Sequence, residues 1–85
     1  MEFTYRTKGT CSSEIHFEIV DHKLHNVVYI NGCNGNLQGI GKLVEGMDID
    51  EVIARLKGIR CGSKFTSCPD QLALALEAAK EKLSA

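Results

Sequence analysis

The residues of this chain best suited to chemistry are four cysteines, Cys11, Cys33, Cys61 and Cys68. Cys68 is followed by Pro69, the one proline in the sequence. Proline suits the first position of a helix, because its φ is already helical and the N–H that it lacks would be unpaired there. The sequence therefore predicts that Cys68 caps the helix that follows. A thiol at a helix N-terminus lies in positive potential, which lowers its pKa and favours thiolate as a nucleophile or metal ligand.

The neighbours of Cys68 also fit a helix start. Asp70 would fall in the first turn, where a carboxylate complements the helix dipole, and Thr66 and Ser67 offer hydroxyl groups to the unpaired amides. The alternative is that Cys68 is a buried, inert residue, since free cysteine is among the most buried residue types. The choice depends on whether other cysteines converge on it.

Length and charge exclude several classes of protein. We expect 85 residues to form a single domain over 1–85, too small for a barrel enzyme. A net charge of −1 without a basic run argues against nucleic-acid binding. Neither a signal peptide nor an apolar run of about twenty residues is found, so we expect a cytoplasmic protein without membrane association. Reducing compartments favour metal binding, catalysis or plain burial of cysteines over disulfides.

The cysteines contain no C-x-x-C pair, so a metal site requires a fold that brings distant cysteines together. Apolar and polar residues alternate over 2–7 and 14–19, and 24–31 is a third apolar stretch, which predicts three strands in an antiparallel meander. In a meander, the turn with Cys11 and the exit of the third strand before Cys33 lie at the same end of the sheet. His22 falls at the opposite end, roughly 20 Å away, and is expected to be a surface residue, as are His16 and His25.

The second half of the chain predicts helices. Leu37, Ile40, Leu43 and Val44 have helical spacing after a glycine and asparagine turn at 31–36, and two further helices are expected over about 48–56 and 69–83. Gly39 and Gly41 each weaken the first helix by about 1 kcal/mol relative to alanine, which predicts that its backbone lies close against another element. Their spacing matches neither G-x-G-x-x-G nor a P-loop, so a phosphate site is not expected.

Three of the cysteines are thus expected in loops at element ends, a placement that core filling does not explain. Clustered thiolates from Cys11, Cys33 and Cys68 would suit zinc or an iron-sulphur cluster. Cys61, in the loop before the last helix, could be a fourth ligand, a resolving thiol or a spectator, and the sequence leaves these alternatives open.

The residues at 66–70, Thr-Ser-Cys-Pro-Asp, resemble the signature of the TSCPD domain family, and 32–37, 43–46 and 56–59 are also similar to that family. The family includes small stand-alone proteins and a domain near the C-terminus of adenosylcobalamin-dependent ribonucleotide reductases, and its cysteines are suspected of binding metal. The resemblance implies an association with ribonucleoside-diphosphate reductase and deoxyribonucleotide synthesis. This chain has no room for a radical barrel, and its tail at 81–85 has no cysteine pair, so we do not expect it to catalyse the reduction alone.

A more distant resemblance is to the U-type iron-sulphur cluster scaffolds, in which three cysteines hold a transient cluster or zinc. By order and spacing, the ligands would be Cys11, Cys33 and Cys68. Two positions depart from the scaffolds: Ser13 stands where they have an aspartate, and Ser67 stands where they have a histidine. These departures argue against cluster assembly and strengthen the case for Cys61 as a fourth ligand.

The sequence therefore predicts an α+β fold, with a three-stranded antiparallel meander packed against about three helices that cover one face, and a cysteine metal site at one sheet edge. The expected function is a zinc or iron-sulphur accessory domain of ribonucleotide reduction, with a reductase as partner. The alternatives are an iron-sulphur or sulphur-carrier scaffold, and a structural or docking module, with a homo-oligomer as another partner arrangement.

Overall fold

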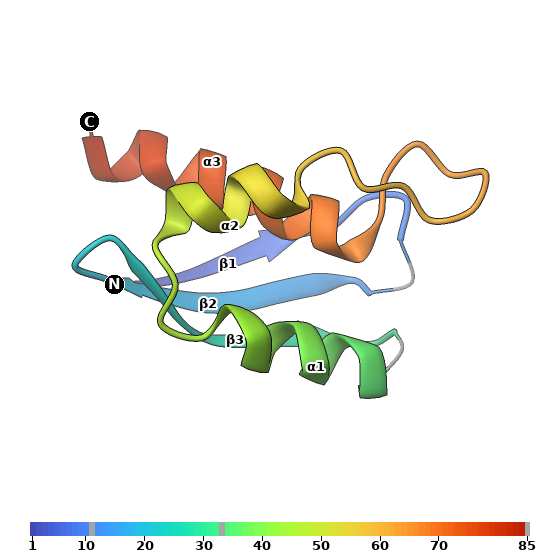
Figure 1. Cartoon of the computed structure of the whole chain (residues 1–85), viewed down its shortest axis with the longest axis horizontal. Helices are drawn as coiled ribbons and strands as arrows, with labels where there is room; N and C mark the ends of the chain where they lie inside the picture. Colours follow the sequence, from blue (N-terminus) through green and yellow to red (C-terminus); the bar gives the residue numbers. More distant parts are fainter. Residues whose placement is uncertain (11, 33, 85) are drawn as a thin grey trace.

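The computed structural model describes residues 1–10, 12–32 and 34–84. Within these residues the chain forms β1 (Glu2–Arg6), β2 (Glu14–Val20), β3 (Lys23–Ile30), α1 (Asn34–Val44), α2 (Ile49–Leu56) and α3 (Cys68–Ser84). The strands pair antiparallel in the order β1-β2-β3. The predicted α+β fold and its meander are confirmed (Figure 1).

The sheet has one buried face because apolar residues alternate along β2. Ile15, Phe17 and Ile19 are buried, while the residues between them face the other side of the sheet. If β3 were regular, the side chain of Asn26, two residues after the buried Leu24, would also point into the core. A register shift opposite His16 and Glu18 and a φ of 55° at Asn26 prevent this, so Val27 packs against the core. A bulge of this kind keeps a polar residue out of the core.

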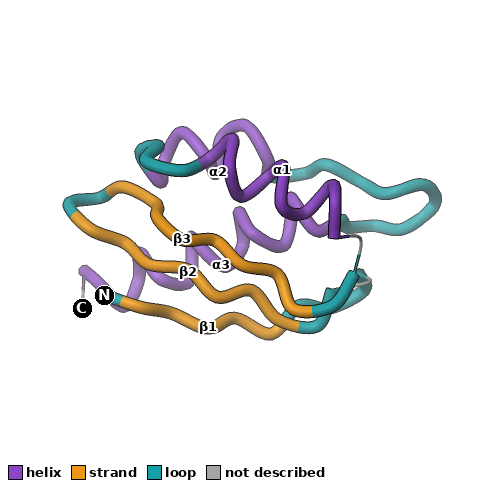
Figure 2. The backbone as a smooth tube through the Cα atoms, turned by 90° about the horizontal axis from the view of Figure 1, so that it is seen from below, coloured by secondary structure: helices purple, strands orange, loops and turns teal. Residues whose placement is uncertain are grey.

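The helices lie mainly on the buried face of the sheet. Figures 1 and 2 show α3 and α2 over this face and α1 alongside β3, with the opposite face uncovered by any helix of the described chain. The core is formed by β2, the start of β3 and the inner sides of α2 and α3, and its fully buried large apolar residues are Ile15, Leu24, Ile49, Val52, Leu72 and Leu76.

Helix α1 differs from the sequence prediction at its start. Residues 34–36 were expected in a turn because of their glycine and asparagine content, but they form the first turn of α1. Asparagine and glycine are tolerated where a helix begins. A Cβ on Gly41 would lie 3.0 Å from the carbonyl oxygen of Val27, whereas one on Gly39 would meet nothing within 4 Å. The predicted close approach is therefore confirmed at Gly41 and wrong at Gly39.

None of the helices in the described segments combines the length and the apolar composition that crossing a bilayer requires.

Candidate metal centre

Helix α3 begins one residue earlier than the sequence predicts. The Ser67 hydroxyl accepts a hydrogen bond from the Asp70 N–H at 3.1 Å, and the Ser67 carbonyl accepts one from the Gln71 N–H at 2.8 Å. Ser67 is therefore the cap, and Cys68 is the first helical residue instead of the cap. A hydroxyl oxygen accepts a hydrogen bond from a helix amide better than a thiol does, which explains why Ser67 and not Cys68 is the cap. Pro69 moves to the second position, where its missing N–H would also be unpaired.

Asp70 ties this helix start to the segment that follows α2. Its carboxylate accepts a hydrogen bond from the Gly58 N–H at 2.7 Å and another from the Thr66 hydroxyl at 2.5 Å. The Gln71 side-chain amide donates to the same Thr66 oxygen at 2.9 Å. Thr66, Asp70 and Gln71 are all buried. The first turn of α3 is thus held by side chains whose polar atoms satisfy one another.

Cys68 is 8% exposed and lies where three segments of the chain meet. Its Sγ is 3.2 Å from the hydroxyl oxygen of Ser12, in the turn after β1. The Tyr29 hydroxyl, near the end of β3, donates to the Cys68 carbonyl at 3.0 Å. Burial raises the pKa of Tyr29, and the negative charge of a Cys68 thiolate raises it further. The turn after β1 and the end of β3 therefore both reach the start of α3.

Cys11 and Cys33 lie outside the described residues, so the prediction that they share a site with Cys68 stays a prediction. Residues that flank them are described. The Ser13 N–H donates to the Ile30 carbonyl at 2.8 Å, and the Asn31 side-chain amide donates to the Ser13 hydroxyl at 3.0 Å. The segment that follows position 11 therefore contacts both Cys68 and the segment that leads toward position 33.

Cys61 lies in the long loop between α2 and α3 and is exposed. Its N–H donates to the Thr66 carbonyl at 3.2 Å, and its carbonyl accepts from the Lys64 N–H at 3.0 Å. These two bonds fold residues 61–66 into a turn that closes next to the start of α3. Whether Cys61 is a fourth ligand stays a prediction.

A family model described as the TSCPD domain matches residues 3–80, nearly the whole chain. The chain belongs to the TSCPD domain family. Neither the search of curated proteins nor the search of solved structures gives a match. In this TSCPD domain, the threonine, serine and aspartate of the signature form the hydrogen bonds that build the start of α3 around its cysteine.

One cluster in the TSCPD domain was missed by the sequence analysis. Among the described residues, His22, Asp48 and Asp50 are the three potential metal ligands whose side-chain atoms come within 4.8 Å of one another. The His22 Nε2 atom is 3.1 Å from Asp50 Oδ2 and 3.8 Å from Asp48 Oδ1. No sequence pattern indicates this cluster, because its residues are brought together only when the β2–β3 turn pairs with the segment before α2 through Lys23 and Asp48.

This cluster is better described as an ion-pair network than as a metal site. The Lys80 ammonium group pairs with Asp50, and this hydrogen bond, followed by the one from His22, lowers the pKa of the Asp50 carboxyl. Asp48 Oδ1 already accepts the Asp50 N–H as the cap of α2. The expectation that His22 is a surface residue is confirmed by its exposed side chain.

Proposed function

We propose that this TSCPD domain is a small metal-binding accessory domain in which Cys11, Cys33 and Cys68 bind a metal ion as thiolates. The observation that supports this proposal most directly is the contact between Ser12 and Cys68, because Ser12 is the immediate neighbour of Cys11. A metal held by three loops would contribute its binding free energy to the stability of the fold.

Zinc is the metal that we favour, and we assign it a structural role. The Ser67 hydroxyl donates to the Ile59 carbonyl at 2.6 Å while it caps α3, and the Ser13 hydroxyl donates to the Ile30 carbonyl at 3.3 Å. At these two positions the U-type scaffolds carry a histidine and an aspartate. Because both serine hydroxyls are hydrogen-bonded to the backbone here, they support a structural site over one that assembles and releases a cluster.

A ribonucleotide reductase is the partner that we propose, and this part of the proposal rests on family membership. The domain would act on the reductase as an accessory module and would not reduce nucleotides by itself. Titration of the purified domain into an adenosylcobalamin-dependent reductase, followed by light scattering, tests the association. No complex at micromolar concentrations of both proteins would remove this part of the proposal and leave the metal site untouched.

The metal site is tested by purifying the protein both anaerobically and aerobically, then measuring metal content, visible absorption and titratable thiols. We expect stoichiometric zinc and a colourless protein under both conditions. A brown, oxygen-sensitive protein with iron and sulphide would favour the iron-sulphur scaffold instead. Protein without bound metal, whose thiols all titrate freely, would contradict both functions and leave a structural module.

Serine variants assign the ligands. Cys11→Ser, Cys33→Ser and Cys68→Ser should each lower the metal content and the melting temperature, because a hydroxyl is a poor ligand for zinc. Cys61→Ser is the matched control, since it removes an exposed thiol from a loop. In cobalt-substituted protein, an unchanged sulphur-to-cobalt absorption in Cys61→Ser would show that Cys61 is a spectator, and a weakened band would make it the fourth ligand.

A further inference from the structure

Strand β1 is an edge strand whose outer side is not paired with any other described strand. Its hydrogen bonds to β2 fix which backbone groups face outward. The Met1 amine donates to the Ile19 carbonyl, and the Ile19 N–H donates to the Met1 carbonyl, both at 2.9 Å. The Thr7 N–H donates to the Ser13 carbonyl at 3.1 Å, so the odd-numbered residues are bonded to β2.

Backbone groups of successive residues in a strand alternate between its two neighbours. The N–H and C=O groups of Phe3 and Tyr5 therefore point toward β2, whereas those of Glu2, Thr4 and Arg6 point toward the open edge. An added antiparallel strand can bond only to the even-numbered residues of β1. This parity restricts how two copies of β1 could pair.

We propose that a second copy of this chain docks antiparallel on the open edge of β1, with Thr4 opposite Thr4 of the second copy. Only this register bonds all three outward-facing residues of each strand, Glu2 with Arg6, Thr4 with Thr4, and Arg6 with Glu2. A shift of two residues in either direction keeps the parity but leaves one of the three without a partner. The product is a continuous sheet that extends through both copies about a two-fold axis at Thr4.

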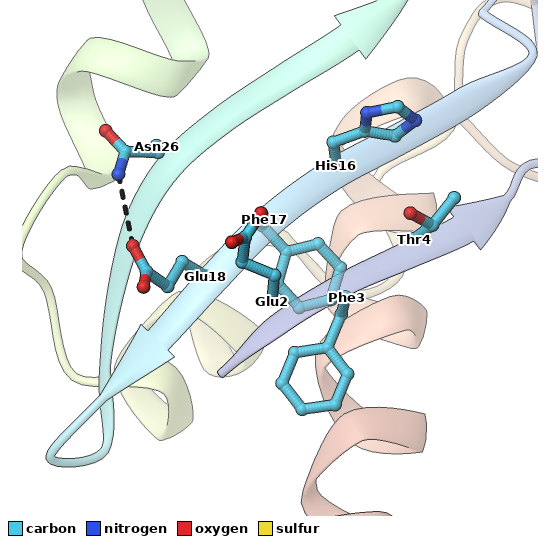
Figure 3. A pocket seen from close by; sticks show the side chains of 7 residues that line it. All are labelled: Glu2, Phe3, Thr4, His16, Phe17, Glu18 and Asn26. Carbon is cyan, nitrogen blue, oxygen red and sulfur yellow. Dashed lines mark hydrogen bonds between the residues drawn. The ribbon is translucent and has the colours of Figure 1, made fainter.

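The side chains of β1 are self-complementary in this register. On the open face of the sheet, Glu2 of each copy becomes the cross-strand neighbour of Arg6 of the other copy. The dimer therefore contains two pairs of opposite charges, which are favourable. Within one copy, Glu2 lies directly opposite Glu18, an unfavourable like-charge pair. Figure 3 shows both carboxylates, with Asn26 donating to Glu18 at 3.2 Å. β2 contains no lysine or arginine, so Arg6 of the second copy would supply a positive charge beside Glu2 that β2 does not.

The other side of β1 is complementary as well. Phe3 and Tyr5 are half-buried, and with Ala75, Ala78 and Ala79 they line a small groove between β1 and α3. Pairing in the proposed register places Phe3 beside Tyr5 of the second copy at this groove, and aromatic cross-strand pairs are favourable. Proline, lysine and β-bulges are among the features that protect sheet edges from pairing. β1 contains neither proline nor lysine, and its register with β2 has no bulge.

Sedimentation velocity over a range of protein concentrations tests the proposal. We expect a dimer for the unmodified chain. Arg6→Glu sets two glutamates against each other at both ends of the paired strands and should raise the dimer dissociation constant about tenfold or more. The charge exchange Glu2→Arg with Arg6→Glu restores opposite charges in both pairs and should restore the dimer, which a defect in folding would not allow.

A second pair of variants tests the backbone bonds. Thr4→Pro removes an N–H that faces the open edge and leaves the bonds to β2 in place, so the strand should persist while dimerisation is lost. Thr4→Val keeps the N–H and should remain a dimer, and circular dichroism checks that both variants are folded. A monomer at every concentration, or a dimer that neither Arg6→Glu nor Thr4→Pro weakens, would overturn the proposal.

Discussion

The Asp70 carboxylate accepts a hydrogen bond from the Gly58 N–H at 2.7 Å, joining the end of α2 to the start of α3. The same carboxylate accepts the Thr66 hydroxyl, and both Asp70 and Thr66 are buried. The aspartate of the family signature thus anchors the loop that carries Cys61 at both of its ends. In this structure its hydrogen bonds hold the first turn of α3 in place.

Asp70→Ala should lower the free energy of unfolding by roughly 2 kcal/mol, because it leaves the buried Thr66 hydroxyl and the Gly58 N–H without their acceptor. Asp70→Asn should cost less, since its amide oxygen can still accept from Gly58. Urea unfolding followed by circular dichroism measures both. Glu77→Gln is the control, because it removes only an exposed ion pair with Lys57 and should change the stability by less than about 1 kcal/mol.

Two glycines of α1 form a matched pair. Gly39→Ala should stabilise the protein by about 0.5–1 kcal/mol, because the added methyl group meets nothing and alanine favours the helix. Gly41→Ala gains the same propensity but forces a methyl group against the Val27 carbonyl oxygen, so we expect it to be the less stable variant by at least about 1 kcal/mol. Thermal unfolding of the two variants side by side measures the difference. Equal stabilities would contradict the close packing of α1 on β3.

The raised pKa of Tyr29 predicts how the stability of the protein changes in alkali. Burial holds its pKa above the ordinary value, and the Cys68 thiolate adds to this effect. Its contribution to stability is therefore complete below the unfolded-state pKa of about 10 and is lost as the pH rises beyond that value. Tyr29→Phe should cost about 1 kcal/mol at neutral pH, through the lost bond to the Cys68 carbonyl, and should show a shallower alkaline loss in urea unfolding. Parallel pH profiles for the two proteins would contradict this.

The lowered pKa of Glu45 predicts that the stability of the protein changes in acid. Its carboxylate accepts the backbone N–H of Asn26 at 2.9 Å and lies 2.7 Å from the His25 ring, so it holds the bulge of β3. The bond from Asn26, followed by that from His25, lowers the pKa of Glu45. The resulting stabilisation is present above the ordinary carboxyl pKa and is lost as the pH falls through the lowered value. Glu45→Gln should be less stable at neutral pH, with a deficit that shrinks in acid. A deficit that is constant with pH would contradict this.

The strands could be predicted from the sequence because alternation is strong along β2, where Ile15, Phe17 and Ile19 form one face. The bulge at Asn26 could not, since nothing in the local pattern indicates a positive φ at that residue. The start of α1 was placed too late because glycine and asparagine favour both turns and helix starts. The start of α3 was missed by one residue because Pro69 fits either of the first two helical positions.

For the candidate site, the sequence predicted a helix start next to Cys68, and the structure places this start within one residue of the prediction. Ser12 contacts Cys68, but the prediction that Cys11 itself lies close to Cys68 stays a prediction. The sequence did not predict that Thr66 and Asp70 bond to each other, because such partners depend on the path of the loop between α2 and α3. The His22 cluster was also out of reach, since its members are joined only by tertiary pairing of distant segments.

Residues in the first turn of α3 form hydrogen bonds to residues 12, 29 and 58. These hydrogen bonds span 56, 39 and 12 positions of the sequence, respectively. Contacts of such separation are costly to form early, so this turn should become ordered after the barrier to folding has been crossed. Substitutions there are then expected to accelerate unfolding while leaving the refolding rate nearly unchanged. The kinetic lifetime of the native protein would accordingly be set at the end of the sheet where its cysteines are proposed to meet.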